Sequence, residues 1–187
     1  MKRQLKTWNV WVLCAALLLF AQSAAAQANS NAAGVNLNAV LNPQLTVNAS
    51  PATVNFTLPP GGTDTGDSPV TISTRWILPF GYSFFFANVS LWAYFTSPAA
   101  ALSNGAGNNI PAARVSGSLN GGAFAPFTTA GPFSPASRQI FSQGVFTIPP
   151  FSQGQRTDSL NLQIDTSGLG LPAGIYTGVL VIQARAI

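Results

Sequence analysis

The chain has 187 residues, of which 47% are hydrophobic and only 6% charged, and its formal net charge is +4. It contains no histidine, a single cysteine (Cys14) and four acidic residues, all of them aspartates. Without histidine, glutamate or a cysteine in the expected mature chain, the common nucleophile systems and imidazole or thiolate metal sites are excluded. We therefore expect no enzymatic activity, no catalytic or metal-binding residues and no cofactor.

The first 28 residues are typical of a secretory signal peptide. A basic start precedes the apolar run Val10–Phe20, and the small residues of Ser23–Ala28 offer cleavage sites after Ala26 or Ala28. An uncleaved membrane anchor is the alternative, and it is disfavoured because the run is shorter than the roughly 20 residues that span a bilayer. We expect a mature protein without a membrane span that is secreted to the periplasm or the cell surface.

Removal of this segment leaves a nearly neutral chain of about 160 residues, with five arginines and four aspartates. The arginines are scattered and form no basic stripe, so neither nucleic acid nor an anionic membrane is an expected partner. No cysteine remains for a disulfide. The length suits one domain with one hydrophobic core.

The mature chain opens with residues 29–34, a small polar leader that we expect to be flexible. Alternating apolar residues then predict a strand, with its apolar positions at Val35, Leu37, Ala39 and Leu41. Pro43 interrupts this pattern. Two further short strands, 45–47 and 54–58, are predicted on either side of a turn.

A glycine-rich loop at residues 61–69 holds Asp64 and Asp67. Two such carboxylates could contribute to a calcium site, but Ca²⁺ takes 6–8 oxygen ligands, and the ordered spacing of a calcium-binding loop is missing. The other interpretation is a solvated loop, or a turn in which the carboxylates bond nearby backbone groups.

Two long apolar stretches, 70–78 and 82–95, predict strands separated by Pro79–Gly81. Aromatic side chains fall on both faces of the second stretch, so the sheet is either covered on both sides or exposes one face to a partner. The candidate aromatic surface comprises Trp76, Trp92 and Tyr94, with Tyr82 as a further member.

Residues 97–113 are predicted to form a long loop, in which helix is possible only at 98–102. A hairpin is predicted for 114–119 and 124–127, because Asn120–Gly122 between them has the residues of a tight turn. Short strands are predicted at 139–141 and 145–148.

The clearest two-strand pattern is the last one, residues 159–164 and 175–186 joined by turn-forming residues. It predicts either a β-hairpin or a connection between two sheets. The second arm is apolar on both faces, which predicts a well-covered strand with nothing after Ile187 to cover its edge. Asp158 and Asp165, on either side of the first arm, are interpreted as strand-end turn residues rather than as a carboxylate pair of an active site.

Short strands with glycine and proline punctuation predict an all-β fold, namely an immunoglobulin-like β-sandwich formed as a single domain by residues 35–187. Three segments also resemble the opening and closing strands of chaperone–usher pilin subunits, of the alpha-type and spore-coat-U-like kinds. These segments are Val35–Val47, Val54–Phe56 and Pro172–Leu180.

The resemblance implies an incomplete sandwich that the N-terminal strand of the next subunit completes, with self-association into a filament and a periplasmic chaperone as partners. An open sheet edge with apolar pockets needs such a strand to cover it. The candidate donor positions are Val35, Leu37, Ala39 and Leu41, and the candidate acceptor edge is formed by Ile175, Val179 and Val181. The alternative is an ordinary first strand that pairs within its own chain.

Two functional classes therefore remain. The first is a structural or adhesive subunit of a secreted surface filament. The second is a self-contained exported immunoglobulin-like domain that binds a carbohydrate or protein ligand through its aromatic surface.

Overall fold

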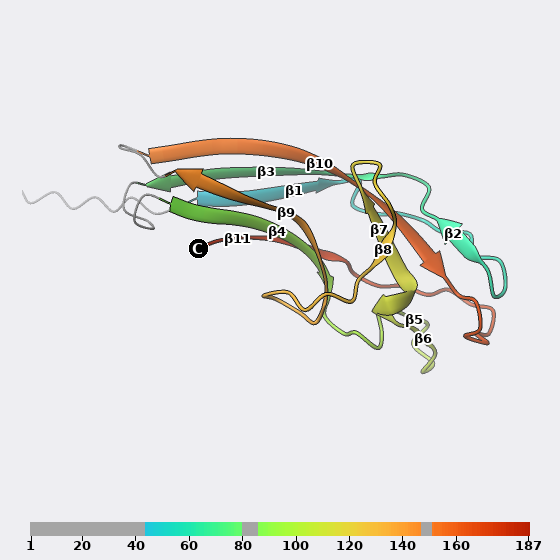
Figure 1. Ribbon diagram of the computed structural model, residues 1–187. Helices are drawn as coiled ribbons and strands as arrows, with labels where there is room; N and C mark the ends of the chain where they lie inside the picture. Colours follow the sequence, from blue (N-terminus) through green and yellow to red (C-terminus); the bar gives the residue numbers. More distant parts are fainter. Residues whose placement is uncertain (1–43, 80–85, 147–150) are drawn as a thin grey trace, which may run out of the picture. The chain divides into compact units, whose positions relative to one another are not determined.

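The computed structural model describes residues 44–79, 86–146 and 151–187, which all belong to one compact unit (Figure 1). The expected signal peptide and leader, and Tyr82, lie outside the described residues. So do the candidate donor positions Val35, Leu37, Ala39 and Leu41.

The strands form two main antiparallel sheets (Figure 1). The first has the order β1 (Gln44–Ser50), β3 (Val70–Pro79), β10 (Phe151–Asp165), β7 (Val115–Leu119) and β8 (Ala125–Pro126), and β2 (Thr63–Thr65) also pairs with β10. The second has the order β11 (Val181–Ala186), β4 (Phe86–Phe95) and β9 (Ala136–Phe146). A small third sheet joins β5 (Leu102–Ser103) to β6 (Asn109–Ile110), and one turn of 3-10 helix follows at Ala112–Arg114.

The core lies between the two main sheets, because alternate residues of their strands are buried. β3 buries Ile72 and Leu78, and β4 buries Val89, Leu91 and Ala93, all with no exposed surface. β10 adds Leu160, Leu162 and Ile164 to the same core. The predicted all-β fold is confirmed, with a sandwich-like arrangement of sheets.

β10 is much longer than the predicted strand 159–164. The sequence pattern did not predict its first half, because polar residues turn inward there. Asp158 is 2% exposed and accepts hydrogen bonds from Arg156 Nε at 2.8 Å and from Asn120 Nδ2 at 2.9 Å. The Arg156 guanidinium lies 4.8 Å from the ring centre of Phe141 in the facing sheet. The interpretation of Asp158 as a strand-end turn residue is therefore wrong, whereas Asp165 does end the strand and accepts a hydrogen bond from the Ser167 N–H.

Burial raises the pKa of Asp158, but the hydrogen bonds from Arg156 and Asn120 outweigh this effect and hold the pKa below its ordinary value. A charged aspartate can therefore occupy the core at neutral pH. Next to this pair, Gly154 leaves room for the indole of Trp76, which covers the position that a Cβ atom would take.

The predicted hairpin between β7 and β8 is confirmed, since Asn120 and Gly121 both have positive φ angles, 50° and 78°, as a type I′ turn requires. The two short strands predicted after it are one continuous strand, β9, with a bulge opposite Leu91 and Trp92. The predicted loop at 97–113 contains β5, β6 and the start of the 3-10 turn, and no helix forms at 98–102.

The last two strands lie in different sheets, β10 in the first and β11 in the second. Of the two interpretations of this pattern, the connection between sheets is therefore the right one. β11 is also shorter than predicted, because regular pairing with β4 begins only at Val181. β1 and β11 are the neighbouring edge strands of the two sheets.

Candidate functional site: a groove between two sheet edges

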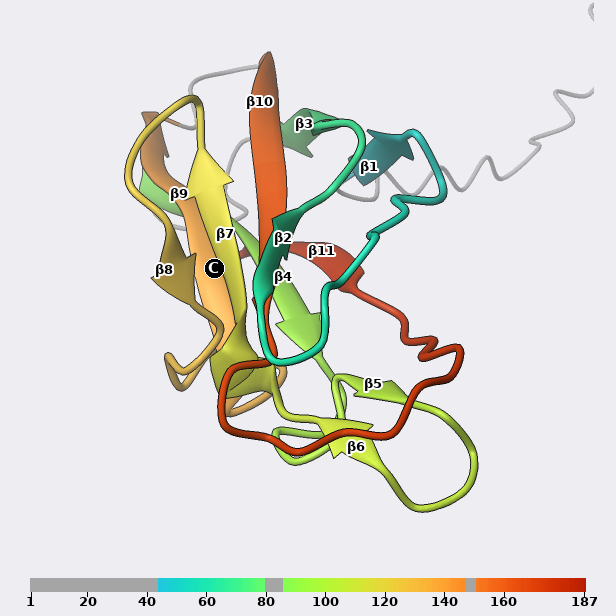
Figure 2. The ribbon, with the colours of Figure 1, turned by 90° about the vertical axis from the view of Figure 1, so that its right-hand side faces the viewer.

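A groove of about 840 Å³ opens where the edges of the two sheets separate. One wall is the chain that continues from β1 toward β2, residues 49–61, and the other is the chain that leads into β11, residues 171–182. In Figure 2 the first segment descends from β1 to β2, and the second runs along the lower edge of the domain and turns up into β11. The groove is therefore bounded by two segments that lie far apart in the sequence.

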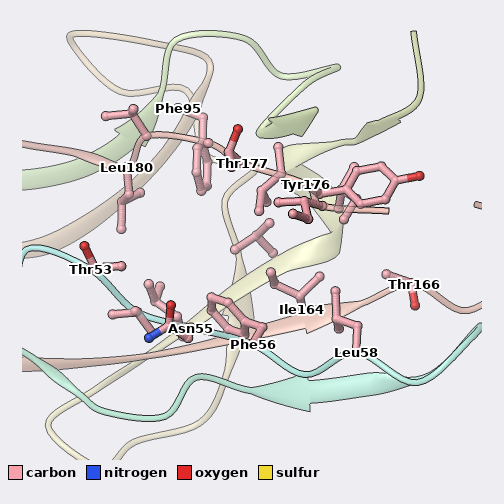
Figure 3. Close-up of a pocket in the computed structure, with 18 of the residues that line it drawn as sticks. Thr53, Asn55, Phe56, Leu58, Phe95, Ile164, Thr166, Tyr176, Thr177 and Leu180 are labelled. Carbon is pink, nitrogen blue, oxygen red and sulfur yellow. The ribbon is translucent and has the colours of Figure 1, made fainter. Parts of the chain in front are cut away.

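The floor of the groove is the core itself. Residues that are at most 8% exposed line it, namely Val70, Phe95, Ile110, Val115, Leu162 and Ile164. In Figure 3, Phe56 and Leu58 of one wall face Leu180 and Tyr176 of the other across this floor. Apolar side chains that enter the groove would thus extend the hydrophobic core.

Within the first wall, residues 53–58 alternate between exposed and half-buried, as in an extended strand, but they pair with no strand among the described residues. Two aspartates hold it. Asp67 accepts the backbone N–H of Asn55 at 3.1 Å and its side-chain amide at 2.8 Å, and Asp64 accepts the N–H of Thr57 at 2.6 Å. The Asp67 N–H also donates to the Asn55 carbonyl at 3.0 Å.

These bonds use only alternate residues of the wall. The backbone groups of Val54, Phe56 and Leu58 have no hydrogen-bond partner within the described part of the chain, and their half-buried side chains line the groove. Backbone groups of successive residues in an extended chain point in opposite directions. The side of the wall opposite Asp64 and Asp67 is therefore an unpaired strand edge.

The hydrogen bonds from Asn55 to Asp67 hold the pKa of this carboxyl below its ordinary value of 3.8. The wall is therefore fastened to a charged carboxylate at neutral pH. Sequence reasoning placed Asp64 and Asp67 in a turn or a calcium site, and missed this role because their partners lie several residues upstream.

The second wall also has an edge, at Ile182, that pairs with no other strand among the described residues. Ile187 and Asn88 exchange both backbone hydrogen bonds, at 2.8 and 3.1 Å, which sets the alternation along β11 and β4. Val181, Gln183 and Arg185 therefore direct their backbone N–H and C=O groups toward β4, whereas Ile182 and Ala184 direct theirs away from it. Further along, Thr177 exchanges both bonds with Ser103, at 2.9 and 3.0 Å, so the wall is held from behind.

The structure places the three predicted acceptor residues on this wall, but not in one covered strand. Val181 begins β11, and Ile175 and Val179 precede it in an irregular segment, where they are 83% and 75% exposed. The prediction that both faces of 175–186 are covered is wrong for this segment, because its outer side is left exposed by the described part of the chain. Ile175 and Val179 instead form the rim of the groove.

The candidate aromatic surface is only partly exposed. Trp76 is 4% exposed and packs in the core, so its assignment to a surface is wrong. Trp92 and Tyr94 are half-buried on the outer face of β4. The Trp92 Nε1–H donates to Ser90 Oγ at 3.3 Å, and Tyr94 stacks on Phe133 at 5.6 Å and donates to Gln183 Oε1 at 2.8 Å. Neither residue lines the groove.

Within residues 44–79, 86–146 and 151–187, no three potential metal ligands of the His, Cys, Asp or Glu type come together. In the same ranges, no helix has the length and hydropathy needed to cross a membrane. The arrangement found in the groove, two free strand edges above an apolar floor, has the chemistry to bind an extended peptide.

Neither a protein-family model nor a curated protein matches this sequence.

Proposed function

We propose that this protein is a subunit of a secreted surface filament, built on an incomplete immunoglobulin-like sandwich that a strand of another subunit completes. The observation that carries this proposal is the groove, whose two walls both present unpaired backbone groups above a floor of core residues. The similarity of the first and last strands to chaperone–usher pilins supports it. In this proposal a signal peptide exports the chain, and a periplasmic chaperone covers the groove before assembly.

The segment that fits the groove is residues 35–41. It alternates apolar side chains, at Val35, Leu37, Ala39 and Leu41, with residues that are mostly polar. An added strand would direct the apolar set to the floor and bond to both walls with its backbone. Antiparallel pairing with the second wall places its C-terminal end near Leu171, at the end of the groove remote from β1.

The segment that joins residues 35–41 to β1 is short, and this favours a donor strand from another molecule. Only Asn42 and Pro43 separate Leu41 from Gln44, where β1 begins. Gln44 lies five residues, about 17 Å, before Ala49 at the near end of the groove. A segment that folded back after a two-residue turn would lie along β1 of its own domain and would not reach Val54–Leu58.

Donation to a second copy makes every contact head-to-tail. Such an interface uses different surfaces on the two subunits, so it generates an open chain unless a rotation closes it into a ring. A filament is the expected assembly. The groove is then both the site of assembly and the site where an unassembled subunit is prone to aggregate.

The test compares the mature chain with a variant that lacks residues 29–41. The mature chain should form oligomers in size-exclusion chromatography and filaments in electron microscopy. The shortened variant should form neither, and should bind a synthetic peptide of residues 33–43. A peptide with Leu37→Asp is the matched control. A shortened variant that still polymerises, or that binds both peptides equally well, would refute the proposed donor.

A further inference from the structure

Exposed large hydrophobic side chains gather at two places on the domain. Among the described residues six are exposed, and three of them (Phe86, Phe146 and Ile187, at 57%, 62% and 58%) lie together. The Phe86 and Phe146 rings are 4.3 Å apart, and Ile187 pairs with Asn88 on the same face, two residues from Phe86. The groove rim holds two more, Ile175 and Val179, and Phe124 stands apart.

We propose that Phe86, Phe146 and Ile187, the end patch, form a second contact between subunits, against the rim residues Ile175 and Val179 of a second copy of this chain. The proposal rests on the proposed function. It adds an interface between folded domains to the one made by the donor strand.

The end patch lies at the same end of the domain as Gln44, the first residue that the structure describes. β1 begins at Gln44, opposite Ile77 near the end of β3, and β4 begins and β9 ends at the paired Phe86 and Phe146 (Figure 1). The C-terminal end of β11 lies at this end as well. A subunit that donates its strand therefore brings its end patch with it.

The linker is too short to keep the two domains apart. Leu41 and Gln44 are three Cα steps from one another, at most about 11 Å. Leu41 would lie at the remote end of the acceptor groove, beside the segment that carries Ile175. The folded domain that begins at Gln44 must then contact that end of the acceptor, and the donor's end patch is the apolar surface that reaches it.

The two surfaces match in chemistry. Both are apolar, none of their five side chains is charged, and each is too small to be a stable interface alone. Contact between the two surfaces would remove five exposed hydrophobic side chains from water, in addition to those buried by the donor strand. Full burial of an exposed phenylalanine is worth about a tenfold change in affinity or more, and Phe86 and Phe146 are already partly buried, at 57% and 62% exposed. Loss of both should therefore weaken assembly at least tenfold.

The experiment uses the full mature chain. Phe86→Ser with Phe146→Ser, and separately Ile175→Ser, should raise the concentration at which half of the protein is polymerised at least tenfold and several-fold, respectively. Phe124→Ser, which changes a phenylalanine that is 41% exposed elsewhere, is the matched control and should have no effect. Circular dichroism and the melting temperature verify that each variant is folded, and Phe→Ala changes replace any serine variant that is not.

Two further readouts separate this inference from the proposed function. Binding of the 33–43 peptide should be the same in the Phe86→Ser, Phe146→Ser and Phe124→Ser variants, because these three residues lie outside the groove. The effects of Phe146→Ser and Ile175→Ser should not be additive, since the two residues would share one contact. Unchanged polymerisation of the patch variants, an equal effect of Phe124→Ser, or full additivity overturns the end patch alone. Failure of the unaltered chain both to bind peptide and to polymerise overturns both proposals.

Discussion

Supplying the missing strand within the same chain should stabilise the domain. The change is a fusion of residues 35–41 after Ile187 through a flexible linker. Ile187 follows β11, and the near end of the groove is at Ile182, five residues back along this strand. The linker must therefore span about 17 Å, which a Gly/Ser segment of about ten residues covers. The fused strand would then run antiparallel to β11 and enter the groove.

The expected gain in the free energy of unfolding is the sum of two favourable contributions and one cost. Burial of Val35, Leu37 and Leu41 on the apolar floor contributes about 1.5–3 kcal/mol each. About six backbone hydrogen bonds to the two walls contribute about 1 kcal/mol each, and ordering seven residues costs about 1–2 kcal/mol each. The net gain is about 2 kcal/mol, which corresponds to a rise of roughly 5 °C in the melting temperature of a domain of this size.

Thermal unfolding followed by tryptophan fluorescence measures this gain, because Trp76 is buried in the core. The control fusion carries Leu37→Asn and Leu41→Asn, which keep the backbone pairing but remove most of the apolar contribution. It should melt below the unaltered fusion. Equal melting temperatures for both fusions and the unfused chain would show that this segment does not occupy the groove.

Three more changes test the groove wall and the core. Asp64→Ala with Asp67→Ala should weaken binding of the 33–43 peptide several-fold in a titration, whereas Asp165→Ala, which changes a carboxylate that does not line the groove, should not. The pKa of Asp67 is lowered from 3.8 in the folded protein, so the contribution of its carboxylate to holding the wall is complete above that pH. This contribution is lost as the pH falls through the lower folded pKa. Peptide affinity should therefore be constant from pH 7 to 5 and decline below pH 4. Gly154→Ala places a Cβ 2.5 Å from Trp76 Cε2, so urea unfolding should show a loss of about 1–3 kcal/mol together with a changed Trp76 emission. Asp158→Asn leaves buried donors without an ionised acceptor and should cost about 1–3 kcal/mol in the same assay.

The sequence predicted those strands whose inward residues are apolar. β3 and β4 alternate clearly, and the turn at Asn120–Gly121 carries the residues that its positive φ angles require. The first half of β10 escaped prediction because Gly154, Arg156 and Asp158 occupy its inward positions. Their burial depends on partners in other strands, Trp76 and Phe141 among them, which no local pattern contains.

The candidate site was predictable only in outline. The apolar alternation of residues 54–58 and 175–182 indicated strands, but not that each would be held on one edge only. For the first wall this depends on Asp64 and Asp67, and for the second on the bridge between Thr177 and Ser103. Side-chain bonds and single bridges of this kind replace a neighbouring strand, and this leaves the groove open.

Hydrogen exchange of the backbone amides tests the central claim most directly, because it reports whether the two free edges become paired. In the variant that lacks residues 29–41, the amides of Val54, Phe56, Leu58 and Ile182 should exchange rapidly. They should become protected when the 33–43 peptide is added, as they should in filaments of the mature chain. Amides of β3 and β10 are paired already and should change little. Rapid exchange at both walls in the peptide complex and in the filament would contradict assembly through this groove.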